Sequence, residues 1–129
     1  MLELLEKPLR VGTGKTAVCA NWILIGEDLL VVLSGEGRHI GGCSLAEPYT
    51  SQDRKNANIS SISCKGHQDI EITRLIAQKV SKQLERVVAV VGGIHVDNAS
   101  KKEINQILAN AQTLGDRLID ILATSSTLE

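Results

Sequence analysis

The chain has 129 residues, of which 43% are hydrophobic, 22% are charged and 2% are aromatic, and its formal net charge at pH 7 is −1. This length and composition predict one soluble globular domain that spans residues 1–129. A nearly neutral chain with so few rings for base stacking is not typical of a nucleic-acid-binding protein.

The first fifteen residues, 1–15, are predicted to form an N-terminal segment ahead of the main fold. They begin MLELLEK, with acidic residues and without the basic and then apolar stretches of a signal peptide. No run of about 20 apolar residues predicts a membrane span. The three cysteines have no metal-site or disulfide spacing and are interpreted as small buried residues. These features favour a cytoplasmic protein without a membrane partner.

The stretch RVGTGKTA, residues 10–17, resembles the end of a nucleotide-binding P-loop. That motif requires a further glycine at position 9, where Leu9 stands, and it lies between a strand and a helix. Pro8 would interrupt a central strand before it, and the apolar residues after Thr16 are typical of a strand. We therefore interpret GTGK as a flexible link or hairpin turn into the first long strand.

Three strands are predicted next, over residues 16–25, 29–34 and 38–46. Because glycine-containing turns connect them, we expect an antiparallel meander. The pair Gly41–Gly42 inside the third strand indicates a bulge, or a place where the flat face of a ligand meets bare backbone. The polar stretch 48–58 is predicted to be an exposed loop, and residues 59–64 a short alternating strand.

The second half of the chain predicts two helices around one strand. Apolar residues at helical spacing indicate helices over about 68–85 and 101–122. Between them, the run VVAVV at 87–91 is typical of a strand buried on both faces. Ser100 and Glu103 form a capping box at the start of the second helix. Residues 123–129 are expected to be a frayed tail.

The predicted order is therefore β-β-β-(β)-α-β-α. This favours an α/β fold of the α+β kind: a single two-layer domain with a mainly antiparallel sheet of about five strands and two helices on one face. The strands at 22–25, 29–33 and 87–91 are apolar at successive positions. We infer that the uncovered face of the sheet is buried by a second copy of the chain, as in a homodimer, or by a partner protein.

Three glycine-containing stretches, 35–42, 63–69 and 92–98, each hold one of the three histidines of the chain. Each lies at or near a strand end, where ligand sites of α/β folds gather. We expect a ligand-binding pocket there, with no catalytic residue and no metal ligand assigned. The candidate binding residues are Arg38, His39, Gly41, Gly42, Lys65, His67, His95 and Asp97.

Each charged candidate also has a structural interpretation. Arg38 suits a bidentate contact to a carboxylate or phosphate, or it is a solvated residue at a strand end. Lys65 and the amides before the first helix suit an anion, or Asp69 simply caps that helix. His95 and Asp97 point the same way if the strand continues, and then suit a shared metal or proton transfer. Alternatively, Asp97 turns the chain into the second helix.

The segments VVGGIHVDNASKKEINQILANAQTL, LSGEGRHIGGCSLAEPY and SCKGHQD resemble the LpdD family, small proteins encoded beside UbiD-type hydroxyarylic acid decarboxylases. The similarity spans about residues 16–122. It implies a protein that does not itself decarboxylate. Such a protein binds prenylated flavin mononucleotide (prenylated FMN) as cargo and helps to deliver it to, or mature it in, a UbiD-type decarboxylase. It also implies a fold similar to that of proteasome assembly chaperones, which is often dimeric.

Two alternatives remain open at this point. One is a protein-assembly chaperone that holds a partner subunit without a small ligand. The other is a small enzyme that uses His39, His67 and His95, with or without a metal. The resemblance carries no fixed binding motif, so the candidate residues rest on their chemistry alone.

Overall fold

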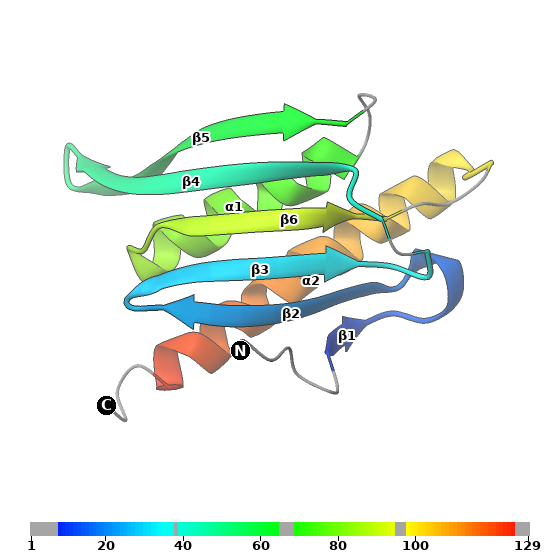
Figure 1. Cartoon of the computed structure of the whole chain (residues 1–129), viewed down its shortest axis with the longest axis horizontal. Coiled ribbons are helices and arrows are strands. Elements are labelled where there is room, and N and C mark those ends of the chain that lie inside the picture. The colour runs from blue at the N-terminus through cyan, green and yellow to red at the C-terminus, as the bar shows by residue number, and fades with distance from the viewer. Residues whose placement is uncertain (1–7, 38, 65–68, 95–97, 126–129) are drawn as a thin grey trace.

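The computed structural model describes residues 8–37, 39–64, 69–94 and 98–125. Within them, six strands form one sheet and two long helices pack on the same face of it (Figure 1). The predicted two-layer α+β class is therefore confirmed. In chain order, the elements are β1 (Leu9–Val11), a 3-10 turn η1 (Gly14–Thr16), β2 (Val18–Ile25), β3 (Asp28–Ser34), β4 (Gly42–Ser51), β5 (Arg54–Ser63), α1 (Asp69–Leu84), β6 (Val88–Gly93) and α2 (Lys101–Ser125).

The strands lie in the order β1-β2-β3-β6-β4-β5. All neighbouring pairs are antiparallel except β3 and β6, which are parallel. The predicted meander is correct for β2 and β3 but wrong for the next step, because β6 lies between β3 and β4. The β-branched run of β6 takes a central position, where both of its edges are hydrogen-bonded. The connection at 35–41 is long enough to pass over one strand width of about 4.8 Å.

The stretch 48–58 was predicted as a loop, and this is wrong. It forms the distal part of a long hairpin in which β4 and β5 pair over ten residues each. Gln52 and Asp53 make the two-residue turn with φ of 52° and 62°, as a tight hairpin requires. The polar composition suggested a loop because this part of the hairpin extends beyond β6 and is largely exposed.

The core lies between the sheet and the two helices. The side chains of β3 and β6 point alternately to the two faces of the sheet. Those buried against the helices are Leu29, Val31, Leu33, Val88 and Val90. The helices contribute one buried stripe each, which includes Ile76, Val80, Leu114 and Leu118. Both predicted helices are confirmed, and neither is long and apolar enough to cross a bilayer.

The opposite face of the sheet is not covered by any described element (Figure 1). The strand register places two rows of side chains across it. One row runs through Val32, Val91, Cys43 and Ile62, and the other through Ile23, Leu30, Ala89 and Leu45. We call these eight residues the apolar band. The run at 87–91 is thus buried on one face only, because Ala89 and Val91 belong to the band and are half-buried.

Candidate ligand-binding end of the sheet

The three histidine-containing stretches start at the same end of the sheet. Ser34 pairs with Gly93, and Gly42 pairs with both Gly92 and Ser63. The N–H of Gly41 donates to the carbonyl oxygen of Gly92 over 3.0 Å, and the N–H of Cys64 donates to that of Gly41 over 2.8 Å. We call this the histidine-loop end. Stretches separated by about 30 residues in the sequence therefore leave the sheet side by side.

Of the candidate residues, three lie within the described part of the chain. His39 is exposed in the connection from β3 to β4, whereas Gly41 and Gly42 are buried. Arg38, Lys65, His67, His95 and Asp97 lie outside the described residues. The structure therefore brings together the strand ends that carry the candidates, and their roles in binding stay predictions.

Gly42 is closely packed on the helix side of the sheet. A Cβ atom at Gly42 would lie 2.9 Å from Cδ1 of Ile70 and 3.0 Å from the carbonyl oxygen of Ile62. Helix α1 therefore fills the space beside this glycine. The flat face of a ligand therefore does not fit against the helix side of Gly42.

A chain of hydroxyl groups fixes α1 to the sheet next to this end. The hydroxyl oxygen of buried Ser44 in β4 lies 2.8 Å from that of Thr73 in α1 and 2.9 Å from that of Ser61 in β5. Thr73 also donates to the carbonyl oxygen of Ile70, and Arg74 donates to Ser61. Hydrogen-bonded hydroxyls in a packed layer allow few alternative positions. The network therefore sets where the first turn of α1 lies.

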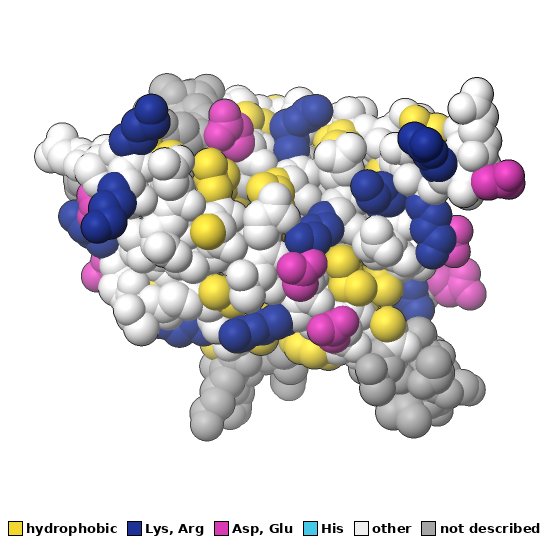
Figure 2. All heavy atoms as spheres, turned by 180° about the vertical axis from the view of Figure 1, so that it is seen from behind, with side chains coloured by type: hydrophobic (Ala, Val, Ile, Leu, Met, Phe, Trp, Pro, Cys, Tyr) yellow, Lys and Arg dark blue, Asp and Glu magenta, His cyan; other side chains and the backbone are white. Residues whose placement is uncertain are grey.

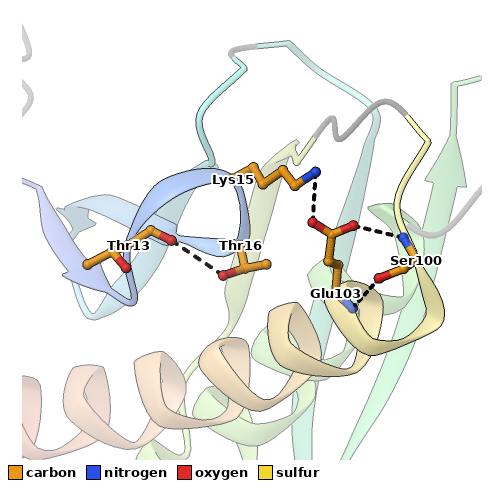
Figure 3. Close-up of polar contacts among 5 residues, drawn as sticks. All are labelled: Thr13, Lys15, Thr16, Ser100 and Glu103. Carbon is orange, nitrogen blue, oxygen red and sulfur yellow. Dashed lines mark hydrogen bonds and ion pairs between the residues drawn. The ribbon is translucent and has the colours of Figure 1, made fainter.

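A second polar cluster joins η1 to the start of α2 (Figure 3). The backbone N–H groups of Ser100 and Glu103 donate to each other's side chains, which confirms the predicted capping box. The other carboxylate oxygen of Glu103 lies 2.8 Å from Nζ of Lys15. The hydrogen bond from Lys15 lowers the pKa of Glu103, and that from Ser100 adds to the effect. The bond to Glu103 likewise raises the pKa of Lys15.

Lys15 is a charged residue of this end that sequence reasoning did not include. It precedes β2, whose Cys19 pairs with Ser34, so η1 lies beside the connection that follows β3. The side-chain amide of Asn110 in α2 fixes η1 by donating a hydrogen bond to the carbonyl oxygen of Thr16 over 2.9 Å. The capping box could be read from the sequence, but its contact to a lysine 88 positions earlier could not.

Three grooves lined by described residues lie elsewhere on the molecule. One of about 530 Å³ lies along α1 and reaches Gln112 of α2. Smaller hollows lie beside the β4–β5 hairpin and at the start of β6. No three described His, Cys, Asp or Glu side chains are grouped as they would be around a metal ion.

The fold has known counterparts. A chain from the crystal structure of a novel chaperone complex for yeast 20S proteasome assembly is similar to this one over 95% of both chains, with a TM-score of 0.59 and 14% sequence identity. This likeness shows the fold alone, and it agrees with the fold that the resemblance implied. No curated protein sequence matches the chain.

The family itself is shown by sequence. The model of the prenylated flavin chaperone LpdD-like domain matches residues 12–123. The match includes η1, five of the six strands, both helices up to the last residues of α2 and the whole histidine-loop end. The chain therefore belongs to the LpdD-like prenylated flavin chaperone family.

Proposed function

We propose that the protein binds prenylated FMN as cargo at the histidine-loop end and passes it to a decarboxylase of the UbiD type. The observation that carries the proposal is the convergence of three histidine-containing stretches at one sheet end in a chain of this family. In this role the protein carries out no decarboxylation itself, and a shallow site that releases its ligand suits it better than a deep pocket.

The chemistry of this end suits the two parts of a flavin nucleotide. The phosphate needs cations or amide groups, which we assign to Arg38 and Lys65. The ammonium group of Lys15, which contacts Glu103 in this structure, adds a further cation if it contacts the phosphate instead. The ring system needs an apolar surface, and Ile62, whose side chain is 69% exposed, offers one on the open face. We assign contacts with the polar edge of the ring to the other candidate residues, His39, His67, His95 and Asp97.

The test is to co-express the protein with a flavin prenyltransferase, purify it, and record its absorbance spectrum and intact mass under native conditions. A flavin spectrum with a matching mass increase supports the proposal. Arg38→Glu and Lys65→Glu should each weaken binding by more than about 1 kcal/mol, because each removes a charge-assisted contact to phosphate. Arg86→Glu, just before β6 at the opposite sheet end, is the matched control. Unchanged affinity in both variants would place the pocket elsewhere.

A protein-assembly role without a small ligand is the second candidate, and the open apolar band favours it. A colourless protein that captures the decarboxylase in a pull-down would support this alternative. Stoichiometric zinc or iron by elemental analysis would instead support a metal enzyme. The same purified sample thus separates the three functions.

We also propose that a second copy of the chain covers the apolar band. Five strands at about 4.8 Å spacing and some 23 Å of strand length give a planar area of about 550 Å² per copy. Two such faces reach about 1,100 Å², which exceeds the roughly 1,000 Å² needed for a biological interface and is slightly smaller than standard stable interfaces.

A further inference from the structure

Among the strands that the structure describes, β5 is one edge of the sheet and pairs with β4 alone. It runs for ten residues, and from Asn56 to Ser63 it contains neither a charged residue nor a proline. The other edge strand, β1, has three residues, follows Pro8 and is in contact with α2. A long, uncharged edge is a ready template for another strand. The fold therefore protects one edge and leaves the other available.

The outward hydrogen-bonding groups of β5 can be assigned from the ladder. Cys64 donates its N–H to Gly41. Because antiparallel pairs alternate, Ala57, Ile59 and Ser61 turn their N–H and C=O groups away from β4. These three residues can hydrogen-bond to one further strand over residues 57–61, most of the uncharged stretch.

Basic side chains outnumber acidic ones on the helix side of this edge, where Glu71 and Glu85 line the same grooves as Arg74 and Lys82. Arg74 of α1 extends over β5 and donates to the hydroxyl of Ser61 over 3.1 Å. Lys82, two turns further along α1, lines a hollow together with Lys55 and Asn56 of β5. Among the described residues, Arg74, Lys55 and Lys82 form no ion pair. Figure 2 shows this face, with Lys and Arg side chains, and Asp or Glu side chains between them, over the upper part of the molecule where β5 and α1 lie.

We propose that the outer edge of β5 binds an extended, acidic segment of a second protein, which adds a seventh strand to the sheet beside α1. The backbone groups of β5 supply affinity for any extended chain, and Arg74 and Lys82 select carboxylates. These two residues are eight positions apart, about 12 Å along the helix. Four strand residues span nearly the same distance. The preferred segment therefore has acidic residues at positions i and i+4, on the same face of the strand.

A second copy of the chain suits this edge poorly. Antiparallel pairing of two β5 strands around a two-fold axis at Ile59 would place Ser61 of one copy opposite Ala57 of the other, next to Asn56. Arg74 lies at Ser61, and Lys82 and Lys55 lie at Asn56. Like charges from the two copies would then meet twice, which is destabilising. Self-association by the apolar band leaves this edge free.

The test is an NMR titration of the full-length protein with a capped ten-residue peptide. Threonine and valine alternate in this peptide, and two glutamates stand four residues apart. We expect chemical-shift changes at the amides of Ala57, Ile59 and Ser61. The same peptide with glutamines should bind about 2- to 30-fold more weakly, because two exposed ion pairs contribute about 0.2–1 kcal/mol each. Binding needs no flavin, so this result is independent of the proposed cargo role.

The variant Arg74→Glu with Lys82→Glu should reverse the preference and favour a peptide with lysines in place of the glutamates. Arg74→Gln with Lys82→Gln, a milder pair, should bind both peptides equally. Lys101→Glu with Lys102→Glu, in the first turn of α2, is the control and should keep the original preference. The proposal is overturned if β5 amides do not shift or if glutamate and glutamine peptides bind alike. Without peptide, the amides of β5 could become more protected from hydrogen exchange as the protein concentration rises. That result would show that β5 pairs with itself, and it would also overturn the proposal.

Discussion

At the scale of single residues, the contact between Lys15 and Glu103 makes stability depend on pH. The pKa of Glu103 is lowered from 4.5, first by its hydrogen bond from Lys15 and then by that from Ser100. A carboxylate with a lowered pKa stabilises the fold above its unfolded pKa, and this contribution is lost as pH falls through the folded pKa. Lys15, whose pKa is raised from 10.5, loses its contribution only as pH rises above that value.

We therefore expect Glu103→Gln to be less stable than the wild type at pH 7, with the difference fading as pH falls below about 4.5. Urea unfolding at a series of pH values measures it. Lys15 is exposed and Glu103 is half-buried, so added salt should still reduce the difference. Glu27→Gln, in the turn between β2 and β3 and without an ion pair among the described residues, is the control. A difference that persists unchanged at pH 3 would contradict this account.

Gly92 illustrates a backbone position that no other residue can take. Its φ is 142°, and a Cβ atom there would overlap the carbonyl oxygen of Leu33 on the neighbouring strand. Gly26 also has positive φ, at 62°, but a Cβ atom there would meet open space. Gly26→Ala should therefore cost only about 1 kcal/mol of conformational strain.

We expect Gly92→Ala to destabilise the protein by more than about 3 kcal/mol, because β3 and β6 must separate. Thermal unfolding of the two alanine variants provides the comparison. Equal losses in both would mean that positive φ alone, and not the approach of β3, explains the glycine.

At the scale of elements, Ser44 and Thr73 tie β4 to α1 through a buried hydrogen bond. Ser44→Ala leaves a buried hydroxyl of Thr73 with one partner fewer, and we expect a loss of about 1–3 kcal/mol. Thr73→Val should cost a similar amount. Because both changes remove the same interaction, the double variant should cost less than the sum of the two, as a double-mutant cycle by urea unfolding can measure. Additive losses would show that the two hydroxyls act independently.

The helices could be predicted closely from the sequence, but the sheet could not. A 3.6-residue apolar period and a capping box are local signals, and they located α1 and α2 within a few residues at each end. Strand order is not local. Nothing in the residues of β6 indicates that it pairs with β3 on one side and β4 on the other. The distal part of the β4–β5 hairpin, residues 48–58, was missed because a strand with polar residues on both faces lacks the apolar alternation by which strands are recognised.

At the scale of the whole molecule, the sequence indicated which strand ends belong to the candidate site, but not the surface that they form together. Glycines and histidines identified three stretches, and the fold brings these stretches to one end. Two further features depend on tertiary packing, which sequence does not reveal. Ile70 fills the space beside Gly42, and Lys15 reaches the start of α2 from a distant part of the chain.

The apolar band on the open face leads to the last test. Leu45 lies in the band with 50% of its side chain exposed, and Leu24 is 41% exposed at the end of β2 on the opposite face. Both tolerate a charge in an isolated chain, because neither is buried. If a second copy covers the band, Leu45→Glu places a carboxylate in a desolvated interface, whereas Leu24→Glu remains in solvent. Sedimentation should then show a dimer for the wild type and Leu24→Glu, and a folded monomer for Leu45→Glu. A wild type that sediments as a monomer at tens of micromolar would leave the band to a different protein, and Leu45→Glu should then weaken binding of that client instead.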